Sequence, residues 1–278
     1  MSGKVQQYVP VVTTEAGSCL TSANWHEVNV KTVACYLDDL LLKPGADLLK
    51  KIDNLAAYLG WPGTVILNAS RLLANKEGIF TLISPFDGAR IKFNYSELFE
   101  LVNNLKPDVF LVPKNAINDA PELWETLDNS IIPYIPINDL VNQACHKPHG
   151  VYFNFVDEHT NQSVTEYLSR WSHLPSYMSG KIPLNLIHSL RDLGVEYIES
   201  DEPALSAFQG TVYSGSDTVD LIDSSTELQF DVIDPDCDCP TCSQQLTKAY
   251  LHHLYLHTPL LCQRFLIQHN VFQAQRST

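Results

Sequence analysis

The sequence predicts an α/β fold in which eight parallel strands and their connecting helices form a barrel with a small C-terminal metal-binding subdomain. Three observations support this: eight short runs rich in β-branched and aromatic residues, helix-like segments between the runs, and a cysteine cluster near the C-terminus. Parallel neighbours need a crossover connection, which a helix usually supplies. The 278 residues, 45% of them apolar, are enough to bury a sizeable core.

Each expected strand is a short apolar run bounded by turn residues. The eight runs are residues 7–14, 31–37, 63–69, 107–113, 131–137, 150–155, 181–187 and 194–200. The fifth, IIPYIPI, contains two prolines, which lack the N–H that a central strand donates. We therefore expect a TIM-like (β/α)8 barrel that is shortened around its fifth and sixth strands.

The expected helices have apolar residues at three- and four-residue spacing. They are residues 46–60, 95–105, 120–127, 163–171 and 185–194. From residue 205 the chain changes to an alternating, turn-rich pattern typical of a hairpin, which leads into the cysteines and one or two closing helices. The predicted division is a barrel over residues 1–204 and a zinc-binding subdomain, packed on the barrel, over residues 205–278.

Charge and terminal composition narrow the functional classes. The formal net charge is −14, from 32 acidic and 18 basic residues. This balance argues against a protein that holds nucleic acid unaided by wrapping its phosphates. The N-terminal segment has no apolar region typical of a signal peptide, and no apolar run reaches the roughly 18 residues of a membrane span. We expect a soluble, intracellular protein.

The three clustered cysteines, Cys237, Cys239 and Cys242, form a C-x-C-x-x-C motif suited to three thiolates around one metal ion. Four histidines are candidates for a fourth ligand: His252, His253, His257 and His269. We favour His269, because the helical stretch before it is long enough to bring it back to the cysteines. A closed Cys3His set leaves no position for substrate, so the prediction is one structural Zn²⁺ per chain.

The other cysteines, and two histidines beside one of them, receive simpler interpretations. The scattered cysteines are expected to be small buried hydrophobic residues: Cys19, Cys35, Cys145 and Cys262. His146 and His149 have no orderly ligand spacing. We interpret them as part of a surface loop rather than a second metal site.

The cysteine motif, the following AYLHHL and the later HN resemble the tRNA-guanine transglycosylase family. Residues 40–68, 86–112 and 194–203 resemble barrel segments of the same family. The resemblance implies a (β/α)8 barrel with an inserted Cys3His zinc subdomain. It also implies an activity that exchanges guanine in the tRNA anticodon for queuine or a precursor.

Four places depart from the residues that the resemblance leads us to expect. A TDSGG turn, whose aspartate works at the exchange site, is matched by LNASR, with Asn68 at the aspartate position. A phenylalanine-aspartate-glutamate turn is matched by VPKN, with Lys114 in the base-reading position. An amide cannot act as a general acid or base near neutral pH, and an ammonium group cannot accept hydrogen bonds from a nucleobase. The bulky GVYFNFV stands where a glycine-rich turn would approach the base.

The fourth departure concerns the nucleophile. The family's aspartate at the end of the eighth strand is matched by Glu199. The proline that follows in the family is kept as Pro203, but the next threonine and arginine are replaced by Ala204 and Leu205. An extra methylene moves the carboxylate enough to spoil its line of attack. Together with Asn68 and Lys114, this predicts that no catalytic residue remains.

These departures resemble the non-catalytic accessory subunit of eukaryotic queuine tRNA-ribosyltransferase. By resemblance, such a chain pairs with a catalytic paralogue in a heterodimer, with a homodimer as the other assembly. The pair would act at the wobble position of tRNAs with GUN anticodons (Asp, Asn, His and Tyr). The location implied is cytoplasmic, with peripheral attachment to the mitochondrial outer membrane as a further option. The expected dimer face is an apolar stripe: Tyr250, Leu251, Leu254, Tyr255, Leu260 and Leu261.

Two alternatives stay open at this point. The chain is an active transglycosylase if Glu199 acts as nucleophile and Asp38, Asp39 or Asp201 replaces the lost acid. The pair Asp38 and Asp39 is otherwise interpreted as a solvated turn at a strand end. The other alternative is a zinc-stabilised barrel that serves as a binding module outside tRNA modification.

Overall fold

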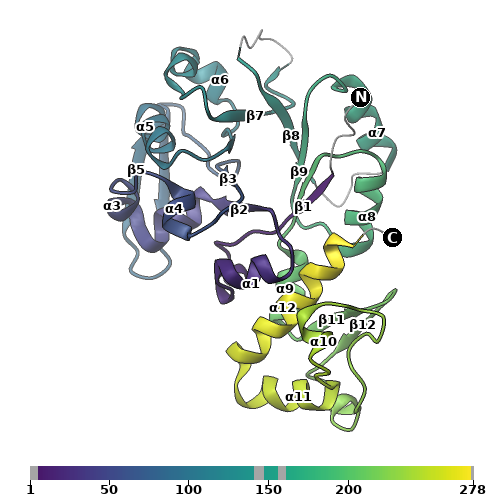
Figure 1. Cartoon of the computed structure of the whole chain (residues 1–278). Coiled ribbons are helices and arrows are strands. Elements are labelled where there is room, and N and C mark those ends of the chain that lie inside the picture. Colours follow the sequence, from purple (N-terminus) through teal and green to yellow (C-terminus); the bar gives the residue numbers. More distant parts are fainter. Residues whose placement is uncertain (1–5, 141–146, 156–160, 277–278) are drawn as a thin grey trace.

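The computed structural model describes residues 6–140, 147–155 and 161–276, and its centre is an eight-stranded parallel sheet that curls into a barrel (Figure 1). The strands are β1 (Gln7–Val9), β2 (Thr32–Tyr36), β3 (Thr64–Asn68), β6 (Val109–Leu111), β7 (Ile132–Pro136), β8 (Gly150–Asn154), β9 (Ser176–Ser179) and β10 (Tyr197–Glu199). Their order is β1-β10-β9-β8-β7-β6-β3-β2. The predicted (β/α)8-type architecture is confirmed.

The two ends of this sheet meet just beyond β1. Val11 forms a parallel bridge with Ala34 of β2, and two backbone hydrogen bonds of 2.9 Å flank it: Ala34 N–H to the Pro10 carbonyl and Val12 N–H to the Ala34 carbonyl. The barrel is thus nearly closed although β1 has only three residues.

The two prolines of β7 lie where they cost no ladder hydrogen bond. The pairing of β7 with β8 begins at Tyr134, opposite Gly150, so Pro133 lies before it. The pairing of β7 with β6 ends at Tyr134, opposite Leu111, so Pro136 lies beyond it. A missing N–H matters only where a partner strand runs alongside. The expected shortening therefore affects the connection more than the strand: between β7 and β8 no helix occurs in the residues that the structure describes.

The predicted strand at 181–187 is wrong. The seventh barrel strand is β9, and residues 184–192 form α8 (Leu184–Asp192), which buries Ile187 and Leu190 at three-residue spacing. The true strand reads SYMS, and its two serines hid it because they gave no apolar alternation. All four β9 side chains are nevertheless buried in the barrel wall.

The remaining helices mostly cover the outside of the barrel. They include α1 (Ser22–Glu27), α2 (Leu37–Leu40), α5 (Tyr95–Leu105), α6 (Ala116–Asp119), η3 (Pro121–Thr126), α7 (Asn161–Arg170) and α9 (Glu202–Phe208). The expected helix over 46–60 is two short ones, α3 (Ala46–Leu49) and α4 (Leu55–Leu59), because Asn54 interrupts the run and caps α4 by accepting from Ala57 N–H. An antiparallel hairpin, β4 (Ile79–Ile83) and β5 (Arg90–Asn94), follows β3 and was not predicted.

The chain after the last barrel strand forms a subdomain at the lower end of the view in Figure 1. It contains β11 (Thr211–Ser214), β12 (Asp217–Asp220), η5 (Ser224–Thr226), α10 (Pro240–Ser243), α11 (Lys248–His257) and α12 (Pro259–Gln275). Helix α12 runs from this subdomain to the barrel, where it packs most extensively on α9. Within residues 6–140, 147–155 and 161–276, no helix has the length and apolarity to cross a membrane.

Aromatic side chains fill the barrel interior. The inner cluster contains Tyr134, Tyr152 and Tyr177, and the ring centroids of Tyr134 and Tyr177 are 5.7 Å apart in an edge-to-face arrangement. Gly150 is required beside them, because a Cβ atom there would overlap the Tyr134 ring. The interior of the barrel at this level is therefore filled by the chain's own side chains.

Candidate metal centre and barrel mouth

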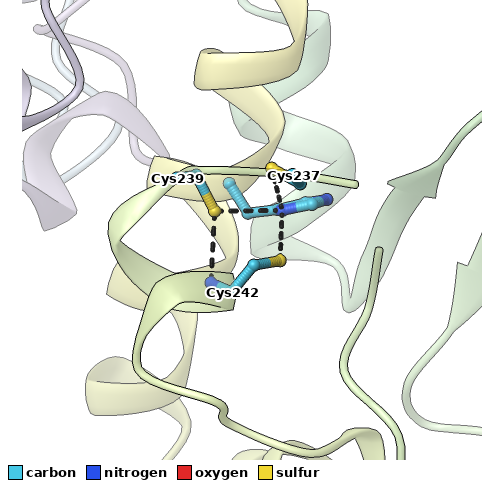
Figure 2. A group of neighbouring side chains, drawn as sticks. Cys237, Cys239 and Cys242 are labelled. Carbon is cyan, nitrogen blue, oxygen red and sulfur yellow. Dashed lines mark hydrogen bonds between the residues drawn. The ribbon is translucent and has the colours of Figure 1, made fainter. Parts of the chain in front are cut away.

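The structure brings the three clustered cysteines and His269 together in one buried group (Figure 2). The His269 Nδ1 atom lies 3.7, 3.3 and 3.4 Å from the Sγ atoms of Cys237, Cys239 and Cys242. Tetrahedral zinc with thiolate and imidazole ligands places its ligand atoms roughly 3.5–3.8 Å from one another. The group therefore fits one zinc ion with all four positions filled by the protein.

Neighbouring groups fix the orientation of the histidine. His269 Nε2 lies 2.7 Å from the Tyr213 carbonyl, so Nε2 donates there and Nδ1 keeps its lone pair for the metal. The next residue, Asn270, accepts from Tyr213 N–H and donates to the carbonyls of Pro203 and Thr211, each at 3.0 Å. The HN pair therefore ties α12 to β11 and to the start of α9.

The cysteine loop is ordered by its own hydrogen bonds. Cys239 caps α10 by accepting from Cys242 N–H at 3.3 Å. Hydrogen bonds from Cys237 and then Cys242 lower the pKa of Cys239, which favours the thiolate form of this side chain. Gln273 of α12 donates to Asp234 at 2.9 Å and holds the loop against the helix.

The other candidate histidines have different roles. His252 Nδ1 lies 2.7 Å from the Leu221 carbonyl, which places this ring in the packing of α11. His253 and His257 are exposed, and their rings lie 4.3 Å apart between centroids in a tilted arrangement. His149 Nδ1 lies 2.8 Å from the Lys147 carbonyl, while His146 and Cys145 fall outside the described residues.

At the carboxyl ends of β3 and β10, Asn68 and Glu199 meet although they are far apart in sequence. Asn68 ends β3 and Glu199 ends β10, and both are fully buried. The Asn68 Nδ2 atom lies 2.9 Å from each Glu199 carboxylate oxygen, and the Tyr177 hydroxyl donates to Oε2 at 2.7 Å. Both carboxylate oxygens of Glu199 are therefore occupied by the chain's own donors.

The pKa of Glu199 reflects two opposing causes. Burial raises the pKa of Glu199 above its ordinary value, and the hydrogen bonds from Tyr177, Asn68 and Tyr36 offset part of this rise. The predicted position Lys114 does not join this network: it follows β6, is exposed, and lines a neighbouring cavity. Sequence analysis missed Tyr177, since its strand was not recognised, and Tyr36, which gave no signal beyond its place at a strand end.

Arg71 covers part of the mouth and was also missed. Its guanidinium carbon lies 4.3 Å from the centre of the Tyr36 ring, and Nη2 is 2.7 Å from Asp38 and 3.4 Å from Asp39. Asp38 is buried and ion-paired, so its interpretation as part of a solvated turn is wrong. Arg71 lines the same cavity as Asn68 and Glu199 and places a large side chain at its edge.

Asp201 leads to a prediction on pH. Thr14 donates to it at 2.9 Å, and burial, followed by the charges of Glu202, Asp39 and Glu199, raises its pKa to about 7 from 3.8. The folded state thus holds a proton that the unfolded state releases, so Asp201 costs stability progressively as pH rises from about 4 to 7. We expect Asp201→Asn to remove this loss, so that the variant gains thermal stability over the parent chain toward pH 7. Melting temperatures across the pH range measure it; a constant difference would contradict the assignment.

The geometry defines a class of protein: a nearly closed parallel barrel with a polar mouth, joined to a buried Cys3His group that fits one zinc ion. A family model described as queuine tRNA-ribosyltransferase matches residues 156–278. Queuine tRNA-ribosyltransferase of Blochmanniella floridana is 23% identical over 97% of this chain and 83% of its own length. That of Thermotoga neapolitana is 23% identical over 95% and 82%, and that of Clostridium acetobutylicum 22% over 91% and 81%.

The similarity to queuine tRNA-ribosyltransferases extends over nearly the whole chain. The region matched by the family model, from residue 156, contains all four metal-group residues and Glu199, and the longer alignments extend over the barrel. The fold and the metal group agree with this similarity.

Proposed function

We propose that this chain is a non-catalytic subunit of a queuine tRNA-ribosyltransferase and acts with a catalytic paralogue on tRNAs with GUN anticodons. The observation that carries the proposal is the Asn68–Glu199 contact. A nucleophile must present a free oxygen to the sugar carbon that it attacks. Glu199 is fully buried, and Asn68 and Tyr177 occupy both of its oxygens.

The acid–base group is also missing at its expected place. Asn68 has an amide that neither takes nor gives a proton near neutral pH, and its Oδ1 accepts from Ser70 N–H at 2.9 Å. Arg71 lies beside it and fills space at the mouth. These three replacements support a scaffold role in which the partner provides the base-exchange chemistry.

We place the partner face on the metal subdomain. Of the predicted stripe, Leu251 is fully buried in the chain's own core, and Tyr255 donates to the Phe208 carbonyl, so both serve internal packing. Tyr250, Leu260 and Leu261 are exposed, and Leu256 joins them. Leu256, Leu260 and Leu261 flank the turn between α11 and α12, whereas Tyr250 lies in the first turn of α11. Exposed apolar side chains of this kind are typical of an interface with another chain.

The test is base exchange with labelled guanine and a GUN tRNA, using the zinc-loaded chain alone and with a catalytic paralogue. We expect no incorporation by the chain alone and incorporation once the paralogue is added. Glu199→Gln in this chain is expected to leave the activity of the pair unchanged.

Activity of the chain alone that Glu199→Gln abolishes would instead establish the active-enzyme alternative, with Glu199 as nucleophile. A chain that neither pairs with the paralogue nor raises its activity would contradict the subunit role. The variant Leu260→Asp tests the proposed partner face. We expect it to weaken pairing with the paralogue while leaving zinc content and folding intact.

A further inference from the structure

Two exposed histidines, His253 and His257, share one face of α11, the helix at the end of the metal subdomain that is far from the barrel (Figure 1). They lie four residues apart in this helix, a spacing that makes side chains neighbours on its surface. Their ring centroids are 4.3 Å apart, and the ring planes are inclined by 52°. The two rings are therefore adjacent in space as well as in helical register.

Neither ring takes part in the internal hydrogen bonding of the subdomain. The preceding residue, His252, is buried, and its Nδ1 lies 2.7 Å from the Leu221 carbonyl. In the part of the chain that the structure describes, by contrast, no hydrogen bond or ion pair joins His253 or His257 to another residue. The nitrogen atoms of both rings are thus available to an ion from solution.

The separation of the rings suits a shared metal ion. An imidazole nitrogen binds zinc at about 2.0–2.1 Å, which places the ion about 3.2 Å from the ring centre. Two rings that bind one ion at an angle of about 90–110° therefore have centres roughly 4.5–5.2 Å apart. The observed 4.3 Å lies just below this range, so a small rotation of two exposed side chains brings one nitrogen of each ring to the ion.

The chemistry of the pair selects the kind of ion. Imidazole nitrogen suits zinc, copper and nickel, whereas magnesium and calcium prefer oxygen ligands. Two histidines at this spacing on one helix are a known arrangement for binding zinc. The surrounding subdomain, residues 205–278, contains eight acidic and three basic residues, so its surface attracts cations.

We propose that His253 and His257 form a second metal site, separate from the Cys3His group, which takes Zn²⁺ or a similar divalent transition-metal ion through one nitrogen of each ring. Within the described residues no third histidine, cysteine or carboxylate joins the pair, so a tetrahedral ion keeps two positions open. These positions lie beside exposed Leu256 on the proposed partner face and would accept ligands from a partner chain. That consequence rests on the proposed function, whereas the site itself does not.

The experiment titrates the chain, already loaded with its Cys3His zinc, with further Zn²⁺ and follows binding by calorimetry. We expect one more zinc per chain in the parent. His253→Ala and His257→Ala should each weaken this second event at least about tenfold, since even the groups behind a metal ligand contribute 10- to 100-fold. Both variants should keep the first zinc and the parental melting temperature, because both side chains are exposed.

The matched control is His26→Ala. His26 is an exposed histidine of α1 with no other histidine three or four residues away, so its replacement should leave the second zinc unchanged. The control ion is Mg²⁺, which should not compete for the site.

A parent chain without a second zinc event would overturn the site. Parental affinity in either His253→Ala or His257→Ala would overturn the shared ligand set, and so would competition by Mg²⁺. A chain that binds the second zinc through both histidines but never pairs with a paralogue would contradict the proposed function and leave this site standing.

Discussion

Replacing Cys239 with alanine is expected to abolish zinc binding and to unfold the metal subdomain. The loss removes one of four ligands and also the sulfur that caps α10. Structural zinc contributes on the order of 10 kcal/mol to small metal-dependent folds, so the remaining packing cannot replace it fully. We expect about one zinc per parent chain and none in the variant, with α11 and α12 becoming sensitive to proteolysis.

Cys262→Ala is the matched control for this prediction. Cys262 is also a buried cysteine of the subdomain, but its Sγ contacts the Leu251 carbonyl at 3.3 Å and not the metal group. It should keep its zinc and lose only a modest amount of stability. A Cys239→Ala chain that retains zinc at parental stoichiometry would refute the ligand assignment.

Replacing Asn68 with aspartate should destabilise the barrel rather than restore catalysis. The change puts a second carboxylate where Asn68 Nδ2 now donates to Glu199 at 2.9 Å, in a site without exposure. Breaking a buried polar pair in this way costs roughly 3–5 kcal/mol. The two carboxylates would share a proton, and because burial raises their pKa, the loss grows as pH rises above the ordinary carboxyl range of about 4.

Urea unfolding at two pH values measures this effect, and the double variant Asn68→Asp with Glu199→Gln is its control. The exchange restores one amide and one carboxylate in contact, so the double variant should recover at least half of the lost stability. If the single variant unfolds within about 1 kcal/mol of the parent chain, the contact contributes little. Base exchange by Asn68→Asp alone would show that the site is one substitution from activity.

The structure explains why these side chains have to change together. Glu199 reaches Asn68 only because β3 and β10 both end at the same mouth, and an aspartate at residue 68 would meet it as a like charge. Arg71 balances Asp38 and Asp39 next to this network. The side chains at the barrel mouth thus form a satisfied hydrogen-bond network. Substitution of one member, such as Asn68, therefore disturbs several partners.

The sequence alone was sufficient for the barrel class, for seven of the eight strand regions and for the choice of His269 beside the cysteines. These features follow from local periodicity, or from a motif whose metal chemistry allows few ligand sets. The SYMS strand escaped because burial within a barrel wall does not require apolar residues when serines find hydrogen-bond partners, as Ser179 does with Asn154.

Only the tertiary structure decided what the replaced residues do. Nothing local in the sequence brings Asn68 to Glu199, 131 positions away, or sets Arg71 over Tyr36. Nor does the local sequence show that Lys114 lines a cavity next to the cavity that Glu199 lines. Such contacts depend on which strand ends meet when the barrel closes, and closure is set by the summed packing of all eight strands rather than by any one segment.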